Sequence, residues 1–261
     1  QSLALLPRRP GGVKAYHRTM SDIPIPPPAP ATIAATPFTE AERAAVYRAI
    51  YERRDMRHFA GGAVPQEVLL RLLRAAHHAP SVGFMQPWRF IRVQSADLRQ
   101  AIHALVEEER VRTAHALGER EEDFMKLKVQ GVLDAAEVLV VAMPPGREAH
   151  IFGRRTLPEM DIASAACAIQ NLWLAARAEG LGMGWVSIFD PQALAHLLHM
   201  PEGAHPLGVL CLGLAADRAR LGVAPVIQFI KRDAQENKVN KLTWDDYTLS
   251  PMELVDAVWR D

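Results

Sequence analysis

The chain has 261 residues, of which 49% are hydrophobic and 23% are charged, so it can bury one substantial core. Its 30 basic and 30 acidic side chains give a formal net charge of zero, which argues against a nucleic-acid or membrane-surface partner and favours a small substrate. No segment reaches the ~18 consecutive apolar residues of a membrane-spanning helix. Cys167 and Cys211 lie in apolar segments, where we expect buried, reduced thiols of a cytoplasmic protein.

The first 37 residues differ in composition from the remainder. Residues 1–20 carry arginines and a short apolar patch, without the long apolar core of a secretory signal, and are interpreted as a leader. Residues 21–37 are rich in proline and alanine, which favours an extended backbone. We therefore expect residues 1–37 to form an extended or mobile arm and residues 38–261 to form one domain.

Two helices and a strand are predicted next. The first helix runs from Thr39 to Arg54, and its apolar side chains at helical spacing are expected to be buried: Ala44, Val46, Ile50 and Tyr51. The second begins at Pro65 and ends before Pro80, with an inward stripe of Val68, Leu69, Leu72, Leu73 and Ala76. Residues 89–93 read as a strand.

The later elements alternate between helix and strand. Charged helical stretches are predicted at 97–109 and 119–133, and their polar ends favour a mobile cover over a site. Further strands are predicted at 138–142, 183–189 and 208–214, and further helices at 162–178 and from Pro191. This interleaving predicts an α+β domain with helices packed on a sheet.

The segment Arg53-Arg54-Asp55-Met56-Arg57 places three guanidinium groups around one carboxylate. Arginine is well suited to fork around a phosphate, so the segment favours an anionic cofactor. The alternative is a solvated helix end whose cations face the helix C-terminus and pair with Asp55. The turn-rich segment 79–88, which carries Ser81 and Gln86 just before a strand, shifts the balance towards a binding site.

Other motifs are weaker. Gly180-x-Gly182-x-Gly184 lies between a helix and a following strand, the reverse of the dinucleotide-binding order, so a Rossmann site is rejected. Ser187 lacks the surroundings of a hydrolase nucleophile. The histidines are scattered and no Cys/His set has ligand spacing, so no metal site is expected.

The arginine segment, followed by Ala-Pro-Ser and Gln-Pro-Trp, resembles the flavin-binding pattern of the nitroreductase family over about residues 40–215. Longer strings at 76–88, 158–161, 168–180 and 184–191 resemble a branch that consumes its own flavin. The resemblance implies a nitroreductase-like α+β fold with a mostly antiparallel central sheet flanked by helices. It also implies a homodimer with FMN sites formed between the subunits.

The resemblance also implies roles for individual residues. Arg53, Arg54 and Arg57 would hold the phosphate and flavin edge, and Ser81 and Gln86 would contact the cofactor. Ser187 would lie beside the reactive ring and Asp55 near the ribityl chain, where ordinary members commonly carry serine or another small residue. After Leu214 the family pattern is hard to trace, and Lys241 would replace an arginine that usually contacts the phosphate.

The implied reaction is the oxygen-dependent fragmentation of reduced FMN to 5,6-dimethylbenzimidazole, the lower ligand of vitamin B12, and erythrose 4-phosphate. A separate flavin reductase would supply reduced FMN at the expense of NAD(P)H, and Asp55 would relay protons. One alternative is a conventional NAD(P)H-dependent FMN nitroreductase or flavin reductase. Another is a flavin carrier without catalytic activity.

Overall fold

The computed structural model describes residues 37–126 and 128–215, and the chain divides into two units, residues 1–43 and 44–261. In the described part of the first unit, the Thr39 N–H and hydroxyl both donate to Glu42 Oε2, at 2.8 and 2.7 Å. This reciprocal capping starts helix α1 (Glu40–Glu52), as the sequence predicts. The expected arm lies outside the described residues up to position 36.

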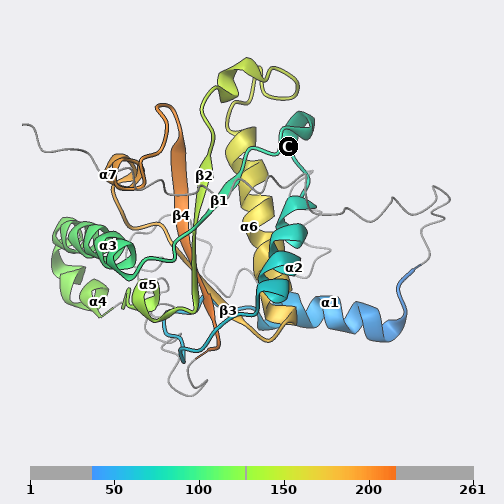
Figure 1. Ribbon diagram of the computed structural model, residues 1–261, viewed down its shortest axis with the longest axis horizontal. Helices are drawn as coiled ribbons and strands as arrows, with labels where there is room; N and C mark the ends of the chain where they lie inside the picture. Colours follow the sequence, from blue (N-terminus) through green and yellow to red (C-terminus); the bar gives the residue numbers. More distant parts are fainter. Residues whose placement is uncertain (1–36, 127, 216–261) are drawn as a thin grey trace, which may run out of the picture. The chain divides into compact units, whose positions relative to one another are not determined.

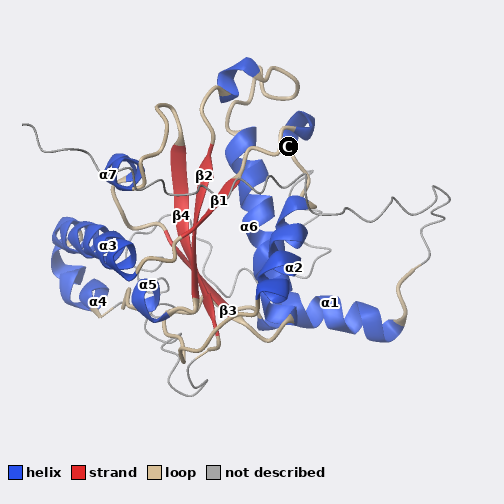
Figure 2. Cartoon of the chain, viewed as in Figure 1, coloured by secondary structure: helices blue, strands red, loops and turns tan. Residues whose placement is uncertain are grey.

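The second unit is built on a four-stranded antiparallel sheet with the strand order β1-β2-β4-β3 (Figure 2). Its strands are β1 (Arg89–Arg92), β2 (Glu137–Met143), β3 (Gly182–Val186) and β4 (His205–Gly213). All seven residues of β2 are buried, because helices cover both faces of the sheet and leave no solvated side on this strand. The predicted α+β class and antiparallel sheet are confirmed.

Helices flank the sheet on both sides (Figure 1). One face carries α2 (Gln66–His77) and α6 (Met160–Ala178), and a short 3-10 turn, η2 (Val82–Phe84), follows α2. The other elements are α3 (Ala96–Ala116), η3 (Gly118–Arg120), α4 (Glu121–Met125), α5 (Gly131–Asp134), η4 (Arg147–Ala149) and α7 (Pro191–Leu197). Of these, α3, α5 and α7 contribute buried side chains to a second cluster on the opposite face.

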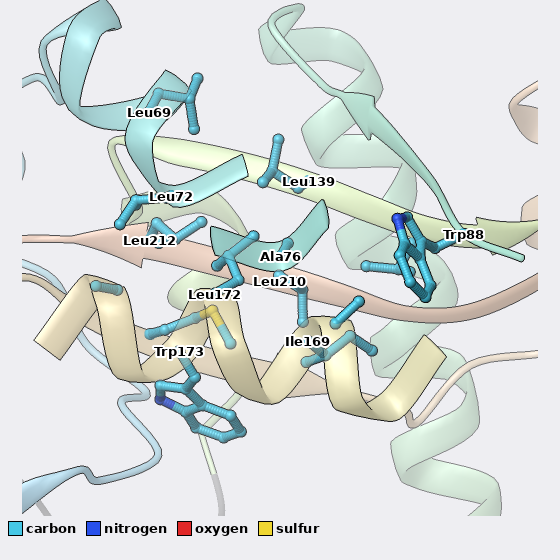
Figure 3. Packing of buried hydrophobic residues seen from close by; sticks show 14 of the residues in the cluster. Leu69, Leu72, Ala76, Trp88, Leu139, Ile169, Leu172, Trp173, Leu210 and Leu212 are labelled. Carbon is cyan, nitrogen blue, oxygen red and sulfur yellow. The ribbon is translucent and has the colours of Figure 1, made fainter. Parts of the chain in front are cut away.

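The larger core lies between the α2–α6 pair and the sheet (Figure 3). Leu69, Leu72 and Ala76 of α2 are buried against α6, as the periodicity of the second predicted helix requires. Val68 and Leu73 flank them and are only partly buried. The buried faces of this helix pair hold α6 firmly against the sheet, and α6 in turn contacts the segments that carry Ser81 and Arg54.

Several sequence-based expectations are wrong. The apolar stripe of α1 is exposed, with Val46 at 46% and Tyr51 at 69%, because no described element packs over it. The strand expected at 183–189 ends at Val186. Cys167 is exposed, since it lies on the side of α6 that faces away from the sheet, whereas Cys211 is buried.

The region from 97 to 133 also differs from expectation. The helix predicted at 119–133 breaks into η3, α4 and α5. Helix α3 is longer than predicted, and its Ile102 and Val106 are fully buried in the second cluster. The Arg99 guanidinium further donates to the carbonyls of Val93, Ala135 and Ala136. The proposed mobile cover is therefore wrong for α3, which is part of the core.

No helix in the two described ranges has both the length and the apolar character needed to cross a bilayer.

Candidate functional site

The segment that carries Asp55 lies alongside strand β3. Asp55 forms a parallel bridge with Met183, and the Met56 N–H donates to the Met183 carbonyl at 3.0 Å. A Cβ atom at Gly184 would lie 2.1 Å from the Met56 carbonyl oxygen, so a side chain there would force the two backbones apart. Gly184 therefore places the carboxylate of Asp55 beside β3.

Two donors fix the orientation of the Asp55 carboxylate. The Trp185 backbone N–H donates to Oδ1 at 3.1 Å, and the Arg57 guanidinium pairs with Oδ2. Both side chains of the ion pair are about one-third exposed, so the carboxylate is held in place yet open to solvent or a ligand. This is an arrangement in which a carboxylate can exchange a proton with a bound molecule.

Ser187 is exposed just beyond the end of β3. It follows Trp185 by two positions, which limits the distance between their Cα atoms to about 7 Å. Because Asp55 is bonded to the N–H of Trp185, the structure brings the two predicted catalytic residues to the same end of one strand.

The three predicted phosphate-binding arginines have separate neighbours. The Arg53 guanidinium lies over the Trp173 ring, 4.5 Å from its centroid, which is cation–π geometry. Arg54 is exposed, and its Nη1 donates to the carbonyls of Tyr51 and Arg53. Arg57 pairs with Asp55. The three groups therefore share a short segment without converging on one point.

Helix α6 anchors this arginine segment. The Trp173 indole N–H donates to the Arg54 carbonyl at 3.3 Å. Arg177 donates to the Glu52 carboxylate at the end of α1, and this hydrogen bond lowers the pKa of Glu52. Two residues in the C-terminal half of α6 thus hold the chain at Glu52 and at Arg54.

Ser81 and Gln86 lie in a tightly bent loop after α2. The Ser81 hydroxyl accepts a hydrogen bond from the Gln86 N–H at 3.1 Å, and the Gln86 side-chain amide donates to the His77 carbonyl at 3.3 Å. Gly83, Phe84 and Gln86 have φ angles of 51°, 55° and 47°. Two non-glycine residues in the left-handed region store strain of about 1–3 kcal/mol each, which is typical of ligand-binding loops.

The two parts of the predicted cofactor site are separated within one chain. The Ser164 hydroxyl accepts from the Val82 N–H at 3.0 Å, whereas Trp173 holds Arg54. Ser164 and Trp173 are nine positions apart on α6, which corresponds to roughly 13 Å along the helix. The end of α6 that holds Arg54 lies beside α1 and β3 in Figure 1. Lys241 lies outside the described residues.

Sequence reasoning missed two residues that position this site. Trp173 carries both the indole bond and the cation–π contact, but its apolar helical surroundings indicated only a core residue. Gly184 stands out in the sequence only as part of the rejected dinucleotide motif. A glycine inside a strand can signal a close backbone approach, and that signal was present in the sequence.

Opposite Gly184 in the sheet lies Cys211 of β4. Burial raises the pKa of its thiol to about 12, an effect that the nearby Arg57 partly opposes. The thiol is therefore protonated and inert near the site. The described ranges contain no group of three or more His, Cys, Asp or Glu side chains able to hold a metal ion.

Comparison with known proteins matches residues 50–214 to the model of the nitroreductase family. The chain is 41% identical over 165 residues to a 5,6-dimethylbenzimidazole synthase of Rhodospirillum rubrum, covering 62% of this chain and 77% of that protein. It is 39% identical over 179 residues to a 5,6-dimethylbenzimidazole synthase of Rhodobacter capsulatus, covering 68% of this chain and 86% of that one.

Among solved structures, the fold is similar to that of an iodotyrosine deiodinase bound to FMN and 3-iodo-L-tyrosine, with a TM-score of 0.56. The sequence identity is 24%, and the alignment covers 66% of this chain and 90% of that chain. It is also similar to a BluB-like flavoprotein from Clostridium difficile, with a TM-score of 0.53 and 20% identity over 66% of this chain and 91% of that one. These likenesses support the fold. The model of the nitroreductase family matches more than half of the chain, so the chain belongs to this family.

Proposed function

We propose that this protein fragments reduced FMN in the presence of dioxygen to 5,6-dimethylbenzimidazole and erythrose 4-phosphate. The observation that carries the proposal is the Asp55 carboxylate, fixed by the Trp185 N–H and Arg57 next to the strand end that bears Ser187. Identities of 41% and 39% to two 5,6-dimethylbenzimidazole synthases, over most of the length of each, support the same reaction.

The donor set of the chain fits FMN. The phosphate and the flavin edge need cationic donors, which Arg53, Arg54 and Arg57 offer at separate points of one short segment. Arg54 in particular is exposed, and its two bonds to backbone carbonyls are made through Nη1. The ribityl chain and the polar ring edge need hydroxyl and amide partners, which Ser81 and Gln86 provide. We infer that Lys241 adds a further cation at the phosphate.

The site would be completed by a second copy of the chain. Within one chain, the arginine segment and the Ser81 loop contact α6 at points roughly 13 Å apart along its axis. In a homodimer, the Ser81 loop of one subunit can face the arginine segment of the other. The exposed apolar stripe of α1 supports this assembly, because a second subunit could cover it.

Asp55 and Ser187 have distinct roles in this proposal. Bound reduced FMN supplies the electrons that dioxygen takes up and the carbon atoms of the product. Asp55 holds and returns protons as bonds of the ribityl chain and ring break, and Arg57 keeps its carboxylate in place between transfers. The exposed Ser187 hydroxyl and N–H offer hydrogen bonds to the edge of the ring. Reduced FMN would come from a separate, NAD(P)H-dependent flavin reductase in the cytoplasm.

An aerobic incubation of the protein with excess FMN, NADH and an unrelated flavin reductase tests this function. Chromatography and mass spectrometry should detect 5,6-dimethylbenzimidazole. The product should be absent when the protein, FMN, NADH or the flavin reductase is left out. Rapid reduction of bound FMN by NADH without the added reductase, followed by full recovery of FMN, would instead identify a conventional nitroreductase or flavin reductase. Reversible FMN binding with no lasting change in air would identify a carrier.

A further inference from the structure

Arg53 is the cation of the arginine segment with the most hydrogen-bonding capacity to spare. Within residues 37–126 and 128–215, no oxygen accepts a hydrogen bond from its guanidinium and no carboxylate pairs with it. Arg57 is paired with Asp55, and Arg54 spends its Nη1 on two backbone carbonyls. The N–H donors of Arg53 are therefore available to an oxyanion.

An aromatic ring holds this guanidinium in place. The Arg53 Cζ atom lies over the Trp173 indole, 4.5 Å from the ring centroid. The attraction between a cation and the face of an aromatic ring is electrostatic, and it needs no hydrogen-bond acceptor. The contact therefore fixes the position of the Arg53 charge while its N–H groups stay available.

The Trp173 ring is itself a fixed platform. It is 9% exposed, belongs to the core between α6 and the sheet, and projects from α6 at the margin of that core (Figure 3). Its indole N–H also donates to the Arg54 carbonyl at 3.3 Å, which ties the ring to the backbone next to Arg53. A free arginine side chain loses much rotamer entropy when a ligand orders it, and a side chain that is already ordered loses less. An anion bound at Arg53 therefore meets a cation that is already in place.

We propose that Trp173 is a positioning residue, which holds the Arg53 guanidinium ready for the phosphate of FMN and so favours FMN over riboflavin. The inference rests on the FMN binding contained in the proposed function and assigns part of its selectivity to Trp173, acting through Arg53. Riboflavin has the same ring and no phosphate, so the ratio of the riboflavin Kd to the FMN Kd reports this effect. A purely structural role of Trp173 would weaken both flavins alike and leave the ratio unchanged.

Titration of the protein with oxidised FMN and with riboflavin, followed by quenching of flavin fluorescence, measures this ratio without turnover. Trp173→Met removes the aromatic face but keeps apolar bulk on α6, and the ratio should fall about fivefold. Trp173→Phe keeps a ring face and loses the indole N–H, so the ratio should stay within about twofold of the unaltered protein. Trp88→Met is the control, because it makes the same change in the same core, at a ring that packs against His77. Its ratio should be unchanged.

A double variant tests whether Trp173 acts through Arg53. Arg53→Leu alone should lower the ratio about tenfold, the loss expected when a charged donor to the phosphate is removed. Adding Trp173→Met to Arg53→Leu should lower the ratio no further, because the cation that the ring positions is already gone. Should Trp173→Met not fold, Arg53→Leu still tests the inference, since an unchanged ratio in that variant would overturn it.

An unchanged ratio in Trp173→Met would also overturn the inference, as would a further fall in the double variant. An equal fall in Trp173→Phe and Trp173→Met would count against it too, because the indole N–H would then carry the effect. FMN binding without formation of 5,6-dimethylbenzimidazole would instead refute the proposed function and leave this inference standing. Product formation with an unchanged ratio would refute the inference alone.

Discussion

At the scale of single residues, Asp55 is held by contacts that its sequence neighbours supply only in part. Arg57 could be predicted as a partner from the sequence, because the two residues are adjacent in the motif. The Trp185 N–H lies 130 positions away and could not, since it depends on how the segment docks on β3. For the same reason the dispersed positions of the three guanidinium groups were not foreseen.

Asp55→Asn keeps the size and the hydrogen-bond acceptor of the side chain but removes its ability to hold a proton. We expect FMN binding within a few-fold of the unaltered protein and product formation lowered by about 100-fold or more, the usual contribution of general acid–base catalysis. The measurements are the Kd for FMN and the yield of 5,6-dimethylbenzimidazole. Asp97→Asn, at an exposed position in the first turn of α3, is the control. An undiminished yield in Asp55→Asn would refute the proton-relay role.

Cys211 gives a residue-scale prediction about pH. Since burial raises its pKa to about 12, its reactive thiolate exists only far above neutral pH, and the protonated thiol dominates below that value. In a Cys167→Ser variant, the remaining thiol should resist a disulfide reagent at pH 9 and react fully once the protein is unfolded in guanidinium chloride. Rapid reaction in the folded variant would show that Cys211 is accessible.

At the scale of elements, helices and strands with strong periodicity could be predicted from the sequence, and their ends could not. The stripe of α2 is buried as predicted because α6 and the sheet are present in the same chain. The similar apolar stripe of α1 is exposed. Helical periodicity predicts that one face of a helix is apolar, but it does not predict which element packs on that face. Helix α3 looked like a surface cover because of its charges, yet its few apolar side chains reach the core.

Gly184 connects the elements to the site. In Gly184→Ala the new Cβ would meet the Met56 carbonyl at 2.1 Å, so the Asp55 segment must move off β3. We expect a loss of about 1–3 kcal/mol in unfolding free energy, the usual cost of forcing atoms into a packed interior, together with loss of product formation. Urea unfolding and the product assay measure the two effects. Gly213→Ala, whose nearest contact would be a milder 3.2 Å, should be better tolerated. Equal stability of Gly184→Ala and the unaltered protein would contradict this account of the backbone approach.

At the scale of the whole molecule, the proposed active site requires two chains. Asp55→Asn and a Ser81→Ala/Gln86→Ala double variant should each be inactive alone. Unfolding and refolding them together should restore about a quarter of the activity, because half of the random dimers are mixed and one of their two sites is intact. If each site were formed within one chain, the mixture would remain inactive. The restored activity is measured as product yield at several mixing ratios of the two variants. Sedimentation verifies that the refolded proteins are dimers.

The central claim is that the protein destroys the flavin it binds, and a single-turnover experiment tests it most directly. Photochemically reduced FMN is bound to the protein without oxygen, air is then admitted, and FMN and 5,6-dimethylbenzimidazole are both quantified. The account predicts that about one molecule of 5,6-dimethylbenzimidazole appears for each bound FMN lost, with no reductase or NADH present. Quantitative recovery of oxidised FMN without 5,6-dimethylbenzimidazole would contradict it.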